Sequence, residues 1–324
     1  MSTDPQAADP NQVGYSLANV GELLTACLDA SEGRSVLEVG AFKGELTALL
    51  LEWAKGSGAS VAAIEPLPPE DLLAVSEAHP ELELIEDTST GPLSTREMPD
   101  AIVIDGDHNY FTLSGELRTI AARSAPAGLP LLMFHDVNWP HARRDSYYAP
   151  ERVPADERQP LAENTGLAPG EPGTVADGLP FEYVAQREGG PRNGVLTAIE
   201  DFIAQHDGLR LVQVPAFFGF GVLWREDAPY DSALSELLRP FDGNPVLGRL
   251  EANRVAHLVT GHARTKRLLE AEATVHRQEE LLRSMIASRA FAIAEKLSTL
   301  RRRGGEPAFS RKRVEEVLRD GDSA

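Results

Sequence analysis

Residues 36–44 read Val-Leu-Glu-Val-Gly-Ala-Phe-Lys-Gly. The apolar run before Gly40 has the composition of a buried strand, and residues 45–51 contain strong helix formers without a breaker. Gly40 and Gly44 therefore stand in a turn between a strand and a helix, where the missing side chains let the backbone approach a ligand closely. Glu38 is placed to hold a cationic or hydroxylated group. This stretch predicts an α/β fold with a ligand at the turn.

Strand-like and helix-like stretches alternate on both sides of this turn. The alternation predicts crossover units and a parallel sheet covered by helices on both faces. Near the end, two strand-like runs are joined by only four residues, which forces an antiparallel pair at the end of the sheet. The predicted fold class is α/β, a doubly wound and mostly parallel seven-stranded sheet with an antiparallel last strand and a C-terminal helical extension. The expected strands are 35–40, 60–64, 82–86, 101–104, 130–134, 209–214 and 219–224, and the helices 16–30, 45–51, 69–78, 111–124 and 193–206.

Composition narrows the class of protein. The 324 residues carry 31 Lys and Arg against 50 Asp and Glu, and 42% are hydrophobic, as expected for one large domain plus an appendage. The one cysteine, Cys27, excludes a disulfide framework and a Cys-rich zinc site, and it favours a reducing compartment. Neither a signal sequence nor an apolar run of membrane-spanning length is recognisable, so a cytoplasmic location is expected.

The body of the chain and its end differ in charge. Residues 246–324 contain 16 Lys and Arg and 11 Asp and Glu, which leaves the preceding residues strongly acidic and repulsive to nucleic acid. We expect a flexible leader over 1–15 and a ligand-binding domain over 16–228. Within that domain, residues 137–191 are rich in Pro, Gly and charge and lack apolar periodicity. They are interpreted either as a lid or substrate loop without its own structure or as a disordered insertion.

The end of the chain is helix-forming over 246–303. Apolar residues recur there at spacings of 7, 4, 7, 4 and 3, which favours packing on a second helix. The helix either dimerises as a coiled coil, giving a homo-oligomer, or folds back on its own domain. Residues 304–324 form a basic and polar tail. The tail either contacts an anionic membrane surface or a partner, or is simply the solvated end of a helix. The spaced residues are Val275, Leu282, Ile286, Ile293, Leu297 and Leu300.

The glycine turn identifies a cofactor class. A dinucleotide fingerprint would need glycines where Phe42 and Glu45 stand. The pattern Glu-x-Gly-x-x-x-Gly instead resembles motif I of class I methyltransferases, which bind S-adenosylmethionine (SAM) in a Rossmann-like fold with a reversed last strand. Glu65 ends the second strand 21 residues after Gly44, where an acid can accept hydrogen bonds from both ribose hydroxyls. The resemblance also implies that Asp87 contacts the adenine.

Two further motifs follow predicted strands that are apolar throughout. Residues 104–108 read Ile-Asp-Gly-Asp-His, and residues 134–136 read Phe-His-Asp. If the two strands are neighbours, Asp105, His135 and Asp136 come within reach of one small cation at the carboxyl edge of the sheet. Carboxylates favour Mg²⁺, whereas a histidine ligand extends the choice to Mn²⁺ or Fe²⁺. The alternative without a ligand is that Asp-Gly at 105–106 is a common turn dipeptide and that Phe-His-Asp at 134–136 caps the next helix.

Together these motifs resemble the metal-dependent O-methyltransferase family that includes macrocin-type and mycinamicin-type sugar methyltransferases, with cephalosporin-hydroxylase-like relatives. The resemblance covers about residues 20–225. It implies that Asp105 and the pair His135–Asp136 bind the metal and that His108 is the general base. The family more often has two acids in the pair, so His135 leaves the metal open. Asp107 is either a further ligand or a partner that orients His108.

The resemblance implies a SAM-dependent, metal-assisted O-methyltransferase that acts on a hydroxyl of a sugar or glycosylated natural product. Its cofactors would be SAM and a divalent metal, and its partner a small-molecule or glycan acceptor rather than nucleic acid. Two alternatives stay open: an oxidative enzyme like the hydroxylase relatives, and a scaffold that works through its helical extension. Residues 143–148, with two arginines and two tyrosines, either grip the acceptor or form a solvated loop.

Overall fold

The computed structural model describes residues 14–125, 128–301 and 310–321. The first part of the predicted leader, 1–13, and parts of the predicted tail, 304–309 and 322–324, lie outside the described residues. The chain divides into two compact units, Met1–Thr260 and Gly261–Ala324. Among the described helices, none combines the length and the hydropathy that crossing a bilayer requires.

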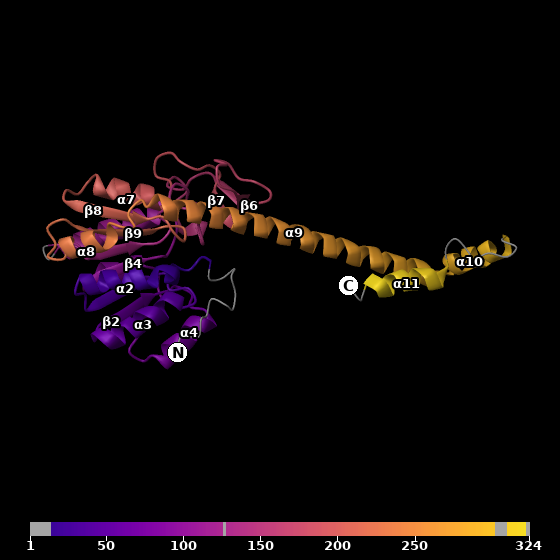
Figure 1. Cartoon of the computed structure of the whole chain (residues 1–324), viewed down its shortest axis with the longest axis horizontal. Coiled ribbons are helices and arrows are strands. Elements are labelled where there is room, and N and C mark those ends of the chain that lie inside the picture. The colour runs from indigo at the N-terminus through magenta and orange to yellow at the C-terminus, as the bar shows by residue number, and fades with distance from the viewer. Residues whose placement is uncertain (1–13, 126–127, 302–309, 322–324) are drawn as a thin grey trace. The chain divides into compact units, whose positions relative to one another are not determined.

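The first unit is built on a seven-stranded sheet (Figure 1). The five strands at one side are parallel, and β9 runs antiparallel to both of its neighbours, β5 and β8. The predicted α/β class, strand directions and terminal pair are therefore confirmed. Across the sheet the order is β3 (Glu83–Ile85), β2 (Ser60–Ile64), β1 (Ser35–Val39), β4 (Ala101–Ile104), β5 (Leu131–Phe134), β9 (Phe220–Arg225) and β8 (Leu209–Val214).

Helices cover both faces because successive strand residues point to opposite sides of the sheet. In β1, for example, Val36 belongs to one apolar cluster and Leu37 to the other. The predicted helix at 16–30 begins as a 3₁₀ turn. One face carries η2 (Leu17–Val20), α2 (Gly21–Ala30), α3 (Glu45–Ser57), α4 (Glu70–Ala78) and α8 (Asp231–Leu238); the other carries α5 (Thr90–Thr95), α6 (Tyr110–Ser124) and α7 (Val195–Ile203).

The expectation that residues 137–191 lack their own structure is wrong. They contain η3 (Pro150–Arg152) and an antiparallel pair, β6 (Leu161–Leu167) and β7 (Leu179–Ala185). Arg144, only 1% exposed, donates to the carbonyl oxygens of Ala185 and Pro172, both at 2.8 Å. Arg143 instead pairs with Glu200. Arg144 thus holds the chain's own backbone and Arg143 pairs with a helix, while contact of this segment with an acceptor stays a prediction.

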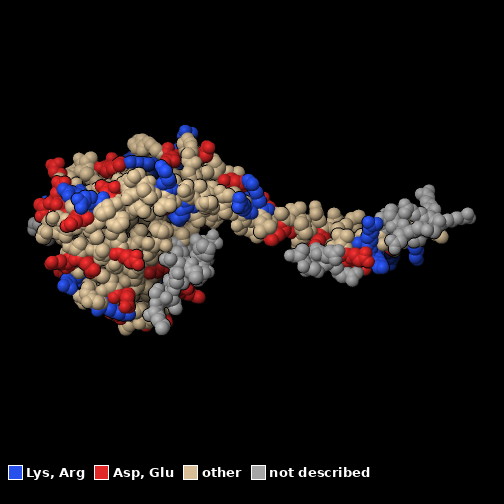
Figure 2. All heavy atoms as spheres, in the orientation of Figure 1, with Lys and Arg blue, Asp and Glu red and all other residues tan. Residues whose placement is uncertain are grey.

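The helical extension consists of α9 (Pro245–Ala287), α10 (Arg289–Arg301) and α11 (Arg311–Gly321), so helix is confirmed over most of 246–303. In the second unit, most of the regularly spaced apolar side chains are exposed, and dimerisation through them stays a prediction. Arg311 at the start of α11 joins both other helices, because its backbone N–H donates to the Glu295 carboxylate of α10 and its guanidinium to the Ile286 carbonyl oxygen of α9, both at 2.7 Å. Figure 2 shows the Asp and Glu side chains distributed over the visible face of the first unit.

Candidate active site

The carboxyl ends of four parallel strands lie level at one edge of the sheet. The register pairs the last residues of β2, β1, β4 and β5 with one another. Backbone hydrogen bonds continue this ladder by one residue beyond each strand. The chemistry-bearing residues that follow the strands therefore form one row, in the order Glu65, Gly40, Asp105 and His135.

The glycine turn packs closely against the loop after β4. Gly40 has a φ of 87°, and a Cβ on it would lie 2.2 Å from the Asp105 carbonyl oxygen. Gly44 has a φ of 82° and precedes the first turn of α3. Phe42 also adopts a positive φ, 44°, and its side chain is 67% exposed. The backbone at Gly40 thus closely approaches the loop after β4. This packing joins the glycine turn to Asp105.

Glu65 supports the glycine turn from the end of β2. Its carboxylate accepts hydrogen bonds from the backbone N–H of Phe42 at 3.0 Å and of Leu67 at 3.2 Å. Asp87 is exposed after β3, and its carboxylate accepts from the Thr88 N–H at 2.7 Å. Their contacts with a ribose and an adenine stay predictions.

Glu38 lies beneath the turn rather than on its surface. The residue is 1% exposed, and the Thr47 hydroxyl donates to its carboxylate at 2.6 Å. Burial raises the pKa of Glu38 to about 8, because the charged form is poorly solvated there. Glu38 therefore ties β1 to α3, and its contact with a cofactor stays a prediction.

The predicted cation ligands come together with His108. His135 Nδ1 lies 3.0 Å from Asp105 Oδ1 and 3.6 Å from Asp136 Oδ2. His108 Nε2 lies 3.0 Å from Asp136 Oδ2 and 3.5 Å from Asp105 Oδ1. Two ligands that bind one ion at about 2.1 Å with angles of about 90–110° are roughly 3.0–3.4 Å apart. The two separations of 3.0 Å lie within this range, and those of 3.5 and 3.6 Å lie slightly above it, so the cluster has nearly the spacing of ligands around one divalent cation.

The electrostatics of the cluster also favour a positive charge. Burial opposes the charged form of His135, but the carboxylates of Asp105 and Asp136 outweigh it and raise its pKa to about 10. Burial likewise opposes charge on His108, and Asp136 and Asp105 again raise its pKa. For Asp105, burial works to raise the pKa, but the two histidines lower it to well below its usual range. The carboxylates thus attract positive charge, which either protons or a cation can supply.

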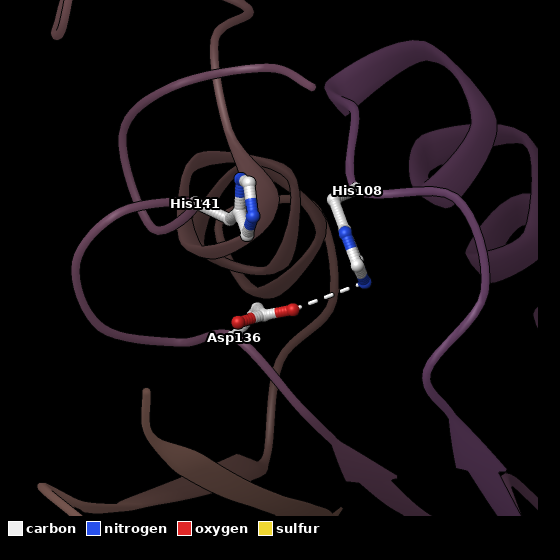
Figure 3. A group of neighbouring side chains, drawn as sticks. All are labelled: His108, Asp136 and His141. Carbon is white, nitrogen blue, oxygen red and sulfur yellow. Dashed lines mark ion pairs between the residues drawn. The ribbon is translucent and has the colours of Figure 1, made fainter. Parts of the chain in front are cut away.

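His141 joins the cluster, although no motif of the sequence singled it out. Its ring stacks on that of His108 with centroids 4.7 Å apart, and Asp136 lies beneath both rings (Figure 3). Burial lowers the pKa of His141 to about 3, so the ring is neutral. His141 Nδ1 is buried and has no hydrogen-bond partner among the described residues, and His108 Nε2 faces the Asp136 carboxylate as an ion pair without hydrogen-bond geometry. The spacing Asp136-x₄-His141, five residues along one loop, was the available signal.

The donor set fits a divalent cation. Potential ligand atoms of Asp105, His135 and Asp136 lie within 4.8 Å of one another, and so do those of His108, Asp136 and His141. Asp136 belongs to both groups, and its backbone φ is 59°. Residues other than glycine adopt such a positive φ mainly where surrounding contacts impose it. Asp107 lies outside both groups, and its carboxylate accepts from the Thr112 hydroxyl at 3.1 Å.

Comparison with known proteins finds solved structures that resemble this chain. No family model and no curated protein matches it. A methyltransferase of Podospora anserina, PaMTH1, bound to S-adenosylhomocysteine, aligns over 68% of this chain and 84% of its own, with 17% identity and a TM-score of 0.43.

Two further solved structures align at a similar level. A 1,6-didemethyltoxoflavin N1-methyltransferase of Burkholderia thailandensis aligns over 69% of this chain and 82% of its own, with 14% identity and a TM-score of 0.40. The O-methyltransferase TomG of Streptomyces achromogenes, in complex with SAM, aligns over 65% and 81%, with 14% identity and a TM-score of 0.39. Likeness at this level assigns neither a family nor a site residue to this chain.

Proposed function

We propose that this protein is a SAM-dependent O-methyltransferase that uses a divalent cation and acts on a hydroxyl of a sugar or glycosylated natural product. The observation that carries the proposal is the position of the cluster of Asp105, His108, His135 and Asp136 beside the glycine turn, on one edge of the sheet. A methyl donor over β1 and β2 would then meet an acceptor over β4 and β5.

The reaction forms a bond between the acceptor oxygen and the methyl carbon while the carbon–sulfur bond of the sulfonium breaks, leaving S-adenosylhomocysteine. An aliphatic hydroxyl is too weak an acid to ionise alone, and a cation held by Asp105, His135 and Asp136 would lower its pKa. His108 takes the proton that the hydroxyl releases. Asp136, 3.0 Å from His108 Nε2, stabilises the imidazolium that results.

The surroundings of His108 support an acceptor with a sugar ring. Tyr148 is 75% exposed, and its ring centroid lies 5.6 Å from that of His108. An exposed aromatic face beside the proton acceptor offers an apolar surface for one side of a sugar, while hydroxyls on the other edge stay free to bind a cation.

Calorimetric titration tests the proposal. After treatment with EDTA, the wild type and Asp105→Ala are titrated with SAM, Mg²⁺ and Mn²⁺, and Asp107→Ala serves as the neighbouring control. We expect the wild type and Asp107→Ala to bind both SAM and a cation, and Asp105→Ala to bind SAM alone. Failure of the wild type to bind SAM under any condition would overturn the methyltransferase proposal.

A specific observation favours one alternative, an oxidative enzyme. His108, Asp136 and His141 are two histidines and one carboxylate, the donor set of many non-haem Fe²⁺ oxygenases. Methyl transfer supported by Mg²⁺ in the absence of oxygen would exclude that alternative. Turnover that requires both Fe²⁺ and oxygen would establish it in place of methyl transfer.

A further inference from the structure

The turn between β8 and β9 has an unusual backbone. Phe217 has a φ of 49° and Phe218 a φ of 64°, both in the left-handed region that bulky side chains rarely adopt. Two consecutive residues of this kind cost about 1–3 kcal/mol each and persist only where other contacts impose the conformation. Something outside the turn must therefore hold it.

Glu251, in the second turn of α9, supplies the main contact. Its carboxylate accepts from the backbone N–H of Phe217 at 3.0 Å and of Phe218 at 2.8 Å. The residue is 8% exposed. Burial alone would raise its pKa, but hydrogen bonds from Arg254 outweigh burial and lower it, so the carboxylate is charged. A charged acceptor makes these two hydrogen bonds stronger than neutral ones.

Arg254, one helical turn further along α9, contacts both Glu251 and the Phe217–Phe218 turn. Its guanidinium donates to both oxygens of Glu251 at 2.7 Å. It also lies over both aromatic rings, 5.3 Å from the centroid of Phe217 and 4.5 Å from that of Phe218. Glu251 and Arg254 together hold backbone and side chains of the turn.

The same turn contacts the proposed cation site. The carbonyl oxygen of Phe217 lies 2.8 Å from His135 Nε2, so this nitrogen carries a proton and donates it. The bond fixes the ring so that Nδ1 points at Asp105, 3.0 Å away. A hydrogen bond to one imidazole nitrogen determines which nitrogen remains for a metal and which way the ring faces.

We propose that Glu251 is a positioning residue for His135: by holding the Phe217–Phe218 turn, it directs His135 Nδ1 into the cation site and thereby sets the affinity of that site. The second half of this statement rests on the function proposed above, whereas the first concerns the orientation of one ring. The proposal makes the start of α9 part of the site.

Nuclear magnetic resonance tests the orientation directly. The full-length protein is labelled with ¹⁵N in its 8 histidines, and the His135 Nε2–H signal is assigned by its loss in His135→Gln. In the wild type the hydrogen bond to Phe217 should protect this proton from exchange with water, with or without a cation. We expect the signal to disappear or broaden in Glu251→Ala and to weaken in Glu251→Gln, which can accept only one of the two N–H bonds.

Two other variants separate positioning from a general loss of stability. Leu28→Ala removes a fully buried side chain of α2 and should lower the free energy of unfolding, but it leaves the Phe217–Phe218 turn intact, so the signal should remain. Glu272→Ala changes an exposed glutamate of α9 and should alter nothing. Titration of the same proteins with Mn²⁺ should show about 10–100-fold weaker binding in Glu251→Ala, the usual effect of losing a residue that supports a metal ligand. Leu28→Ala should stay within about threefold of the wild type.

The outcomes are distinguishable. An unchanged His135 signal in Glu251→Ala and Glu251→Gln would overturn the positioning role, whatever the cation does. Equal loss in Leu28→Ala and Glu251→Gln would also overturn it, because the effect would then follow loss of stability. A signal that depends on Glu251 in a protein that binds no Mn²⁺ or Mg²⁺ would support the positioning of the ring and overturn the proposed cation site.

Discussion

The two halves of the carboxyl edge of the sheet differ in how far the chain satisfies the hydrogen bonds of its own polar groups. On the β1–β2 side, the Glu65 carboxylate accepts hydrogen bonds from two backbone N–H groups, and the Glu38 carboxylate accepts one from the Thr47 hydroxyl. On the β4–β5 side, His141 Nδ1 is buried without a hydrogen-bond partner among the described residues, and His108 Nε2 faces the Asp136 carboxylate without hydrogen-bond geometry. The hydrogen bonds of that side are therefore incomplete.

This difference indicates what each half is built to do. A turn whose acids are held by backbone N–H groups is preorganised as a rigid surface over which a ligand can lie. Polar groups with incomplete hydrogen bonds in a largely buried place are costly unless an ion or a proton completes them. The first half is therefore the expected cofactor platform and the second the expected cation and proton-transfer site, and the following predictions test that division.

The largest expected effect is that of His108→Ala. Without the proton acceptor, turnover should fall by about 10²–10⁴-fold. Affinities for SAM and cation should stay close to those of the wild type, because Asp105, His135 and Asp136 remain. Steady-state kinetics and calorimetry measure both, with His276→Ala, an exposed histidine of α9, as control. A parallel loss of cation affinity would show that His108 is a ligand instead.

Gly40→Ala should damage both halves at once. Its Cβ would lie 2.2 Å from the Asp105 carbonyl oxygen, at a φ of 87°. The free energy of unfolding should fall by about 3 kcal/mol or more. Gly58→Ala is the matched control, because that glycine also has a positive φ but nothing within 4 Å; it should cost only about 1 kcal/mol. Urea denaturation that gave equal losses would contradict the close packing of the two loops.

Glu65→Gln should weaken the cofactor half alone. A neutral amide cannot accept from both N–H groups and two ribose hydroxyls as a carboxylate can, so SAM affinity should fall about tenfold. Mn²⁺ affinity should not change. Glu86→Gln, an exposed neighbour at the end of β3, is the control, and calorimetry gives both constants. Unchanged SAM binding in Glu65→Gln would remove this residue from the cofactor site.

The smallest effect concerns Glu38 and depends on pH. Because its folded-state pKa of about 8 exceeds the usual 4.5, the folded protein retains a proton that the unfolded chain loses between these values. The contribution of Glu38 to the free energy of unfolding therefore decreases as the pH rises from 4.5 to 8. Glu38→Gln removes that dependence, so the variant should be more stable than the wild type at pH 8 and similar to it near pH 4.5.

Denaturation of Glu38→Gln, with the exposed Glu45→Gln as control, measures that difference at the two pH values. SAM affinity of the variant should stay within about twofold of the wild type, since the buried carboxylate supports the turn from below. A tenfold loss of SAM affinity would show that Glu38 contacts the cofactor after all.

Local sequence was most informative where strands end. The five parallel strands and the terminal pair were predictable because buried strands of a parallel sheet are apolar throughout and are bounded by glycine, proline or acids. The segment 137–191 was not, because β6 and β7 are held by long-range contacts of buried polar residues, such as Arg144 with Ala185, that leave no periodic pattern. The short helix α5 was also missed.

The sequence by itself determined the parallel sheet, the glycine turn and the presence of Asp105, His108, His135 and Asp136 at strand ends, because period, composition and chain order are local properties. Only the tertiary structure decided that Glu38 is buried, that His141 stacks on His108, and that Glu251 reaches Phe217 from a helix 34 residues further along the chain. Burial and contacts between distant segments depend on how elements pack, and no local pattern encodes that packing.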